Sequence, residues 1–199
     1  MNWYNLNSSK KETKAEYLAK IKYSKLVTQQ VKGFLEIVGN ELIDNVQYRI
    51  ITNKGFNAIS VFEFIQQNEI IEEIHIAVYR MNQKAVTHLK DIISKGNIKG
   101  NIIVSKFFRE NKKYERWANE LVSFSNSSKL INVAFARNHA KVFLAKTKSE
   151  KYIVFEGSGN LSDNDRIEQY IYENNREVFE FHKKWIIDVV NNEEEYCKS

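Results

Sequence analysis

The sequence predicts an α/β domain in which a mixed, largely parallel β-sheet carries helices on both faces. Segments rich in β-branched and aromatic residues alternate along the chain with segments that repeat apolar residues at helical spacing. This alternation is typical of a sheet whose successive strands are connected by helices. The chain has 199 residues, no proline and no internal repeat, so we expect one domain with a full-sized core.

The first half of the chain predicts helices and strands in regular alternation. Apolar residues at helical spacing run from Val27 to Val38 and continue toward Ile43, which predicts an amphipathic helix before a first strand at residues 48–52. The next expected elements are a helix at 58–67, a strand at 74–79, a helix at 83–94 and a strand at 101–105.

The second half adds antiparallel character. A helix and a strand come first, at residues 114–123 and 130–136. Two apolar segments at 137–145 and 152–155 flank the polar run 146–151, which predicts a β-hairpin. A strand at 168–173 and a closing helix at 176–190 complete the expected fold.

The two ends of the chain differ in composition from its centre. We expect residues 1–25 to form a basic, partly flexible segment, residues 26–190 the folded domain, and residues 191–199 an acidic polar tail. The glutamates at 193–195 favour a solvated tail, and the alternative is an acidic segment that restrains a basic cleft.

No stretch of the sequence predicts a membrane span or a secretory signal. No run approaches the ~20 apolar residues that a bilayer requires. The single cysteine, Cys197, excludes an internal disulfide. We therefore expect a cytoplasmic protein without a membrane partner.

Two short motifs predict phosphodiester chemistry. His139 and Lys141 are two residues apart in the expected strand at 137–145, so their side chains would lie on one side of it, about 7 Å apart. The hairpin would return the chain to them at Gly157, Ser158, Gly159 and Asn160. The glycines would let the backbone approach an anion, while the hydroxyl and amide groups donate to its oxygens.

This pattern resembles the signature of the phospholipase D superfamily, which reads His-x-Lys, then Asp, then Gly-Ser-x-Asn. The matching residues are His139, Lys141, Gly157, Ser158 and Asn160. The sequence departs from the signature in two ways: Lys146 stands where the signature has Asp, and the gap before Gly157 is longer.

The resemblance extends over about residues 47–187. Residues 48–57 look like the opening strand and loop of nuclease-like members, and residues 166–170 like the segment that supplies an acid to the histidine. It implies a phospholipase D-like half-domain at residues 26–190, with Glu168 as this acid and Glu173 as the second choice.

The resemblance also implies a metal-independent phosphodiesterase that needs no cofactor. The family uses two His-x-Lys motifs, so the single motif here predicts a homodimer with one motif from each subunit. His139 of one subunit would form a phosphohistidine, and His139 of the other would protonate the leaving oxygen and activate water. Lys141 and Asn160, beside Ser158, would neutralise the phosphoryl oxygens, and Glu168 would hold the imidazole tautomer.

The charge distribution favours nucleic acid as the partner. The net charge is +5. Basic residues that could follow a DNA or RNA backbone are Lys106, Arg109, Lys112, Lys113, Arg137, Lys146 and Lys148. Aromatic residues that could stack on unpaired bases are Phe107, Phe108, Tyr114 and Trp117.

Two other functions stay open. One is a nucleic-acid-binding module that keeps the phosphate-recognising hairpin without turnover, which Lys146 and the lengthened gap would suit. The other is a phospholipid or other phosphoryl transferase.

The remaining histidines, His75, His88 and His182, lack the spacing of metal sites. We expect His75 to be a satisfied or edge histidine and the other two to lie on solvated helix faces. The sequence therefore predicts no metal site.

Overall fold

The structure is a computed structural model, and it describes residues 33, 35–36, 38–39, 43–44, 46–53, 56–162 and 166–197. Its strands are β1 (Gln47–Asn53), β2 (Ile71–Val78), β3 (Lys99–Ser105), β4 (Ile131–Ala136), β5 (Val142–Thr147), β6 (Tyr152–Gly157) and β7 (Ile167–Asn174). Its helices are α3 (Ser60–Gln66), α4 (Gln83–Gly96), α5 (Lys106–Glu110), α6 (Glu115–Ser128), α7 (Arg176–Asn191) and α8 (Glu193–Cys197). The basic segment at 1–25 lies outside the described residues, as does most of the amphipathic helix expected before β1.

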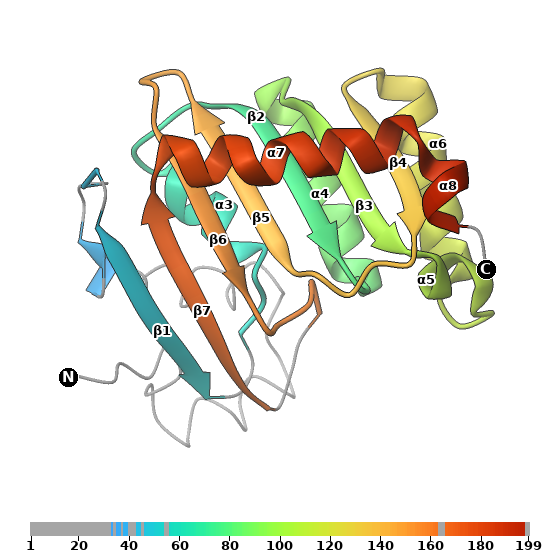
Figure 1. Cartoon of the computed structure of the whole chain (residues 1–199), viewed down its shortest axis with the longest axis horizontal. Helices are drawn as coiled ribbons and strands as arrows, with labels where there is room; N and C mark the ends of the chain where they lie inside the picture. Colours follow the sequence, from blue (N-terminus) through green and yellow to red (C-terminus); the bar gives the residue numbers. More distant parts are fainter. Residues whose placement is uncertain are drawn as a thin grey trace.

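The seven described strands form one mixed sheet in the order β1-β7-β6-β5-β2-β3-β4 (Figure 1). The expected α/β class is thus confirmed, but the share of parallel pairs is smaller than expected. Strands β2, β3 and β4 are parallel, whereas the other four pairings are antiparallel. The connections agree with these pairings: helices link the parallel neighbours β2 to β3 and β3 to β4, while a short turn links the antiparallel neighbours β5 and β6.

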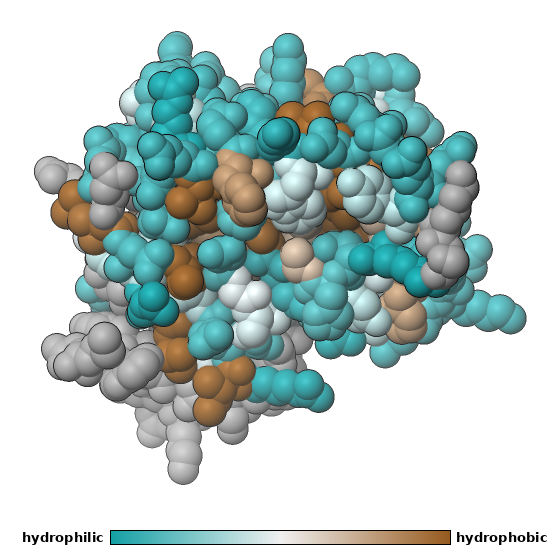
Figure 2. Space-filling model, in the orientation of Figure 1, coloured by the Kyte–Doolittle hydropathy of each residue, from teal (hydrophilic) through white to brown (hydrophobic). Residues whose placement is uncertain are grey.

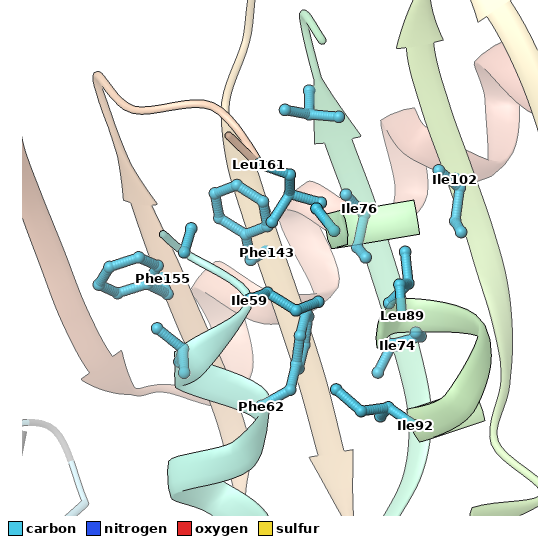
Figure 3. Close-up of a cluster of buried hydrophobic side chains, with 14 of the residues drawn as sticks. Ile59, Phe62, Ile74, Ile76, Leu89, Ile92, Ile102, Phe143, Phe155 and Leu161 are labelled. Atoms are coloured by element: carbon cyan, nitrogen blue, oxygen red, sulfur yellow. The ribbon is translucent and has the colours of Figure 1, made fainter. Parts of the chain in front are cut away.

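Helices cover both faces of the sheet. Helix α7 crosses one face, and α3, α4 and α6 lie behind the sheet in Figure 1. The core on the α3 and α4 side contains Phe62 and Leu89 packed against strand residues such as Ile76 (Figure 3). Under α7, Phe179 and Ile186 pack with a second set of strand residues. Strands β2 and β3 therefore bury residues on both faces, which explains their long apolar runs.

The surface on the α7 side is largely hydrophilic. Figure 2 shows hydrophobic surface gathered toward the half of the sheet that carries β1 and β7. Exposed apolar side chains on β7 and α7 include Ile167 and Phe181. Among the described residues, no helix is both long and apolar enough to cross a bilayer.

The last helix lies against the outer edge of the sheet. Glu193 accepts a hydrogen bond from the backbone N–H of Phe135 at 2.7 Å, and the carbonyl of Tyr196 accepts one from Arg137 at 3.3 Å. Residues 194–196 are exposed, as a solvated tail would be, whereas Glu193 is bound to β4. These contacts use backbone groups that an edge strand leaves unpaired, which makes α8 a cover for β4.

The strand ends that lie beside the carboxyl end of β2 form one edge of the sheet, and they come from distant parts of the sequence. Ala77 near the end of β2 pairs with Val142 at the start of β5, and Val142 pairs with Glu156 near the end of β6. Gly157 in turn pairs with Tyr170 near the start of β7. The loops that carry the two motifs leave the sheet at this edge.

Candidate functional site

His139 and Lys141 contact each other at this edge. The Nζ atom of Lys141 lies 3.0 Å from Nδ1 of His139 and donates to the His139 carbonyl oxygen at 2.6 Å. Lys141 is buried, whereas His139 is exposed. The Lys141 side chain thus contacts the imidazole at Nδ1, while the His139 side chain remains accessible to solvent.

The two residues meet for a different reason from the one predicted. Strand β5 begins only at Val142, so His139 and Lys141 lie in the connection from β4, and the expected strand at 137–145 is wrong at its start. Asn138 causes the difference: its N–H donates to the Ala136 carbonyl at 2.8 Å, and its side chain accepts from the Ala140 N–H at 3.0 Å. Asparagine makes such turns readily because its side chain can pair with nearby backbone.

The predicted hairpin does return the second motif to the first. Strands β5 and β6 pair in antiparallel register, and the N–H of Gly157 donates to the Lys141 carbonyl at 3.1 Å. Three residues further on, Oδ1 of Asn160 accepts a hydrogen bond from the N–H of Arg80 at 3.2 Å. This bond fixes the orientation of the Asn160 amide at the edge that also carries His139.

The two glycines are required by close packing against β7. A Cβ atom on Gly157 would lie 2.1 Å from the carbonyl oxygen of Gln169, and one on Gly159 would lie 1.7 Å from the hydroxyl oxygen of Tyr170. We expected these glycines to admit an anion. The contacts instead give them a structural reason that is independent of any ligand.

Glu168 contacts Ser158 and affects the pKa of Lys141. The hydroxyl of Ser158 donates to the Glu168 carboxylate and accepts from the N–H of Gln169 at 3.0 Å. Burial lowers the pKa of Lys141, and the negative charge of Glu168 partly opposes that shift. The second choice, Glu173, lies near the opposite end of β7, where it faces Val154. Of the two acids, the structure brings Glu168 to the site.

Tyr79 is a site residue that sequence analysis did not single out. It follows β2 directly, and its ring centroid lies 5.0 Å from that of His139. The Lys141 ammonium also lies 5.9 Å from the Tyr79 ring centroid. An available signal was its position at the end of the expected strand 74–79, because side chains at the carboxyl ends of parallel strands commonly form sites.

A cavity of about 570 Å³ opens beside Lys141 and Ser158, on the side of the sheet that carries α7. Arg49 and Gln169 line it from β1 and β7, and Trp185 lines it from α7. The site is therefore open to molecules considerably larger than one phosphate group.

The predicted basic residues separate into two groups. The first group follows the carboxyl ends of β3 and β4, at the same edge of the sheet as the two motifs, and contains residues 106, 109, 112, 113 and 137. Lys146 and Lys148 lie near the hairpin turn, at the opposite end of β5 (Figure 1). Lys146 forms an ion pair with Glu150 at 2.8 Å. These two lysines therefore lie away from the two motifs, and their expected contact with a nucleic-acid backbone stays a prediction.

The other three histidines are engaged in structural contacts. His75 is buried, with Nε2 at 2.8 Å from Glu73 and Nδ1 at 3.1 Å from the Asn101 amide, which confirms a satisfied histidine. His88 pairs with Glu63 at 2.6 Å. His182 pairs with Glu156 at 3.2 Å and accepts a hydrogen bond from Trp185 at 3.1 Å. The expectation of solvated helix faces is therefore wrong for both. Within the described ranges, no group of three His, Cys, Asp or Glu residues could hold a metal ion.

The comparisons with known proteins support the fold. No protein-family model matches the sequence, and neither does any curated protein. Nuc, a phospholipase D family member from Salmonella typhimurium, aligns with a TM-score of 0.55 and 14% identity over 74% of this chain and 96% of that one. The polyphosphate kinase of Porphyromonas gingivalis aligns with a TM-score of 0.54 and 13% identity over 74% of this chain and 26% of the kinase. The protein therefore has the phospholipase D-like fold that its motifs predict.

Proposed function

We propose that this protein is a metal-independent phosphodiesterase that cleaves nucleic acid through a phosphohistidine intermediate. The observation that carries the proposal is the contact between Lys141 and His139 at the edge where Ser158, Asn160 and Glu168 also lie. The likeness to the Salmonella phospholipase D family member supports the choice of phosphodiester chemistry on this fold.

The first chemical step is displacement at phosphorus by a nitrogen of His139. The N–P bond forms as the bond from phosphorus to the leaving oxygen breaks, and His139 of a second subunit gives that oxygen a proton. Water then attacks phosphorus, the N–P bond breaks, and the second imidazole takes the proton of the water. Protons and charges balance over the two steps, and no metal is required.

Lys141 has two roles in this scheme. Before substrate binds, its ammonium nitrogen lies 3.0 Å from Nδ1 of His139. A bound phosphodiester anion would compete for this ammonium group and draw it toward the phosphoryl oxygens. Its buried position strengthens that attraction because little water screens the charge.

A homodimer would supply the second histidine. His139 and Ser158 are both exposed, so a second copy of the chain can approach the site. A two-fold axis beside His139 would place two identical motifs around one phosphorus.

The alternative is a binding module, suggested by Lys146 in place of the aspartate. Lys146 contacts Glu150 and the Tyr152 ring near the hairpin turn, away from His139. Its presence therefore does not alter the residues that would carry the reaction, and this position favours the enzyme over the module.

The test is cleavage of plasmid DNA, single-stranded oligonucleotides and a chromogenic phosphodiester in EDTA. We expect the wild type and the control His88→Ala to cleave and His139→Ala to be inactive. A radiolabelled substrate should leave acid-labile phosphate on the wild type and on His88→Ala but not on His139→Ala, and sedimentation should show a dimer. A strict monomer, or cleavage by His139→Ala, would contradict the mechanism. Salt-sensitive binding of DNA without cleavage would favour the binding module.

A further inference from the structure

A row of aromatic rings begins beside the exposed His139 and continues through Tyr79 and Phe107 to Tyr114. The Tyr79 ring lies 5.0 Å from the imidazole, and the Phe107 ring is stacked on Tyr79 at 5.5 Å with an angle of 10° between the planes. The Tyr114 ring follows at 6.1 Å from Phe107, and the Lys113 ammonium lies 5.6 Å from the centre of Tyr114.

Phe107 differs from the other aromatic residues of its segment. Its side chain is 39% exposed, whereas Phe108 beside it is fully buried. The parallel contact with Tyr79 fixes the plane of an apolar ring that stays partly exposed. The row therefore offers a flat, oriented surface next to the proposed nucleophile.

We propose that Phe107 and Tyr79 form a stacking site for an unpaired nucleobase of the substrate. The inference rests on the proposed function, since this base belongs to a nucleotide next to the phosphate that His139 attacks. Every base has an apolar face that can stack on an aromatic ring, and the stacking energy is largely independent of sequence. Lys113 at the end of the row provides a positive charge for a neighbouring phosphate.

The site therefore selects single strands. A base in a duplex is stacked on both sides, so placing it on Phe107 requires unpairing, which costs a few kcal/mol. Phe107 carries no hydrogen-bonding group and cannot distinguish one base from another. The expected substrate is single-stranded DNA or RNA without sequence preference.

The experiment compares Phe107→Ala with Phe107→Tyr and with a matched control, Phe181→Ala. Phe181 is 67% exposed and lies on α7, where its ring contacts His182. Each variant is assayed on a single-stranded oligonucleotide, on the same strand with abasic residues, and on the duplex. We expect Phe107→Ala to lower kcat/KM on the normal strand by about 5- to 100-fold, with little change on the abasic strand. Phe107→Tyr and Phe181→Ala should behave as wild type.

Equal loss on the normal and abasic strands, or no loss on either, would overturn the stacking site while leaving the phosphodiesterase intact. A protein that cleaves nothing would instead contradict the proposed function. In that case, binding of the normal and abasic strands to His139→Ala, with and without Phe107→Ala, decides the stacking site. Weaker binding of the normal strand alone supports it, and unchanged binding overturns it.

Discussion

Gly159 packs so closely against Tyr170 that a Cβ atom would lie 1.7 Å from the Tyr170 hydroxyl oxygen. Packing restricts movement of the Tyr170 ring away from Gly159. Its centroid lies 4.5 Å from that of Phe155 in a stacked contact and 5.1 Å from that of Phe56 in an edge-on contact. The loop with Ser158 and Asn160 is therefore positioned by a contact that glycine alone permits.

Gly159→Ala should destabilise the protein and displace Asn160. Overpacking of this kind costs about 1–3 kcal/mol, and we expect a lower melting temperature together with a large fall in kcat/KM. Gly96→Ala, at the end of α4, is the control for overpacking away from the site: its Cβ would lie 2.8 Å from a side-chain atom of buried Ile98, so it can lower the melting temperature but should not lower kcat/KM. Equal melting temperatures for Gly159→Ala and wild type would contradict the packing.

Tyr170→Phe should stabilise the protein. Among the described residues the Tyr170 hydroxyl is buried without a hydrogen-bond partner, and burial raises its pKa strongly. An unpaired buried hydroxyl costs about 1–3 kcal/mol, part of which its removal recovers. The measurement is the free energy of unfolding in urea, and a loss of stability would show that the hydroxyl makes a favourable contact.

Glu168→Gln should shift the alkaline limb of the activity profile to lower pH. Burial lowers the pKa of Lys141, and the charge of Glu168 partly offsets this. Without that charge, Lys141 loses its proton at a lower pH, and the rate that depends on its charge falls earlier. Ser158→Ala keeps the charge of Glu168 and is the control: its rate can fall, but the limb should stay in place. An unshifted limb in Glu168→Gln would contradict the coupling.

Glu73→Gln should remove stability that depends on pH. Hydrogen bonding to His75 is the main cause that lowers the Glu73 pKa from 4.5 to about 2, and Lys183 of α7 adds to it. A depressed carboxylate pKa contributes stability that is present above about pH 4.5 and is lost as the pH falls toward 2. We expect the free energy of unfolding of Glu73→Gln to be about 1–3 kcal/mol lower than that of the wild type at pH 7. This difference should become smaller as the pH falls. Glu180→Gln, on the exposed surface of α7, should show no such trend in urea unfolding at several pH values.

Glu193→Ala should expose the edge of β4. Glu193 pairs with the Phe135 N–H, whereas its neighbour Glu194 is exposed. We expect a loss of about 1 kcal/mol for Glu193→Ala, together with more aggregation, since an uncovered edge strand can pair with another chain. Light scattering and urea unfolding against Glu194→Ala test this, and equal behaviour of the two variants would contradict it.

The strongest sequence predictions depended on local patterns. The helix expected at 83–94 is observed as α4, where Asn82 caps the start and Asn97 ends it in the left-handed conformation. The hairpin was likewise correctly placed, and Gly157 returns to Lys141 as expected. Periodicity and turn-forming residues are sufficient for such elements because the interactions that define them lie within a few residues.

Other features depended on specific hydrogen bonds. Sequence analysis placed His139 in a strand, whereas the side chain of Asn138 turns the chain before β5 begins. It also treated the glutamates at 193–195 as solvated, although Glu193 accepts a hydrogen bond from the Phe135 N–H on β4. Neither result follows from apolar patterning, because each depends on a hydrogen-bonding partner that competes with solvent.

The sequence by itself determined the fold class, the hairpin and the two motifs whose residues the candidate site contains. The tertiary structure decided which strands pair in parallel, why the glycines are needed, and that Tyr79 lies beside His139 with Phe107 stacked on it. The physical reason is that the hydrophobic and hydrogen-bonding pattern of a segment limits the partners with which it can pair. Several segments of one chain, however, fit the same pattern. Only the packing of all of them together selects one arrangement.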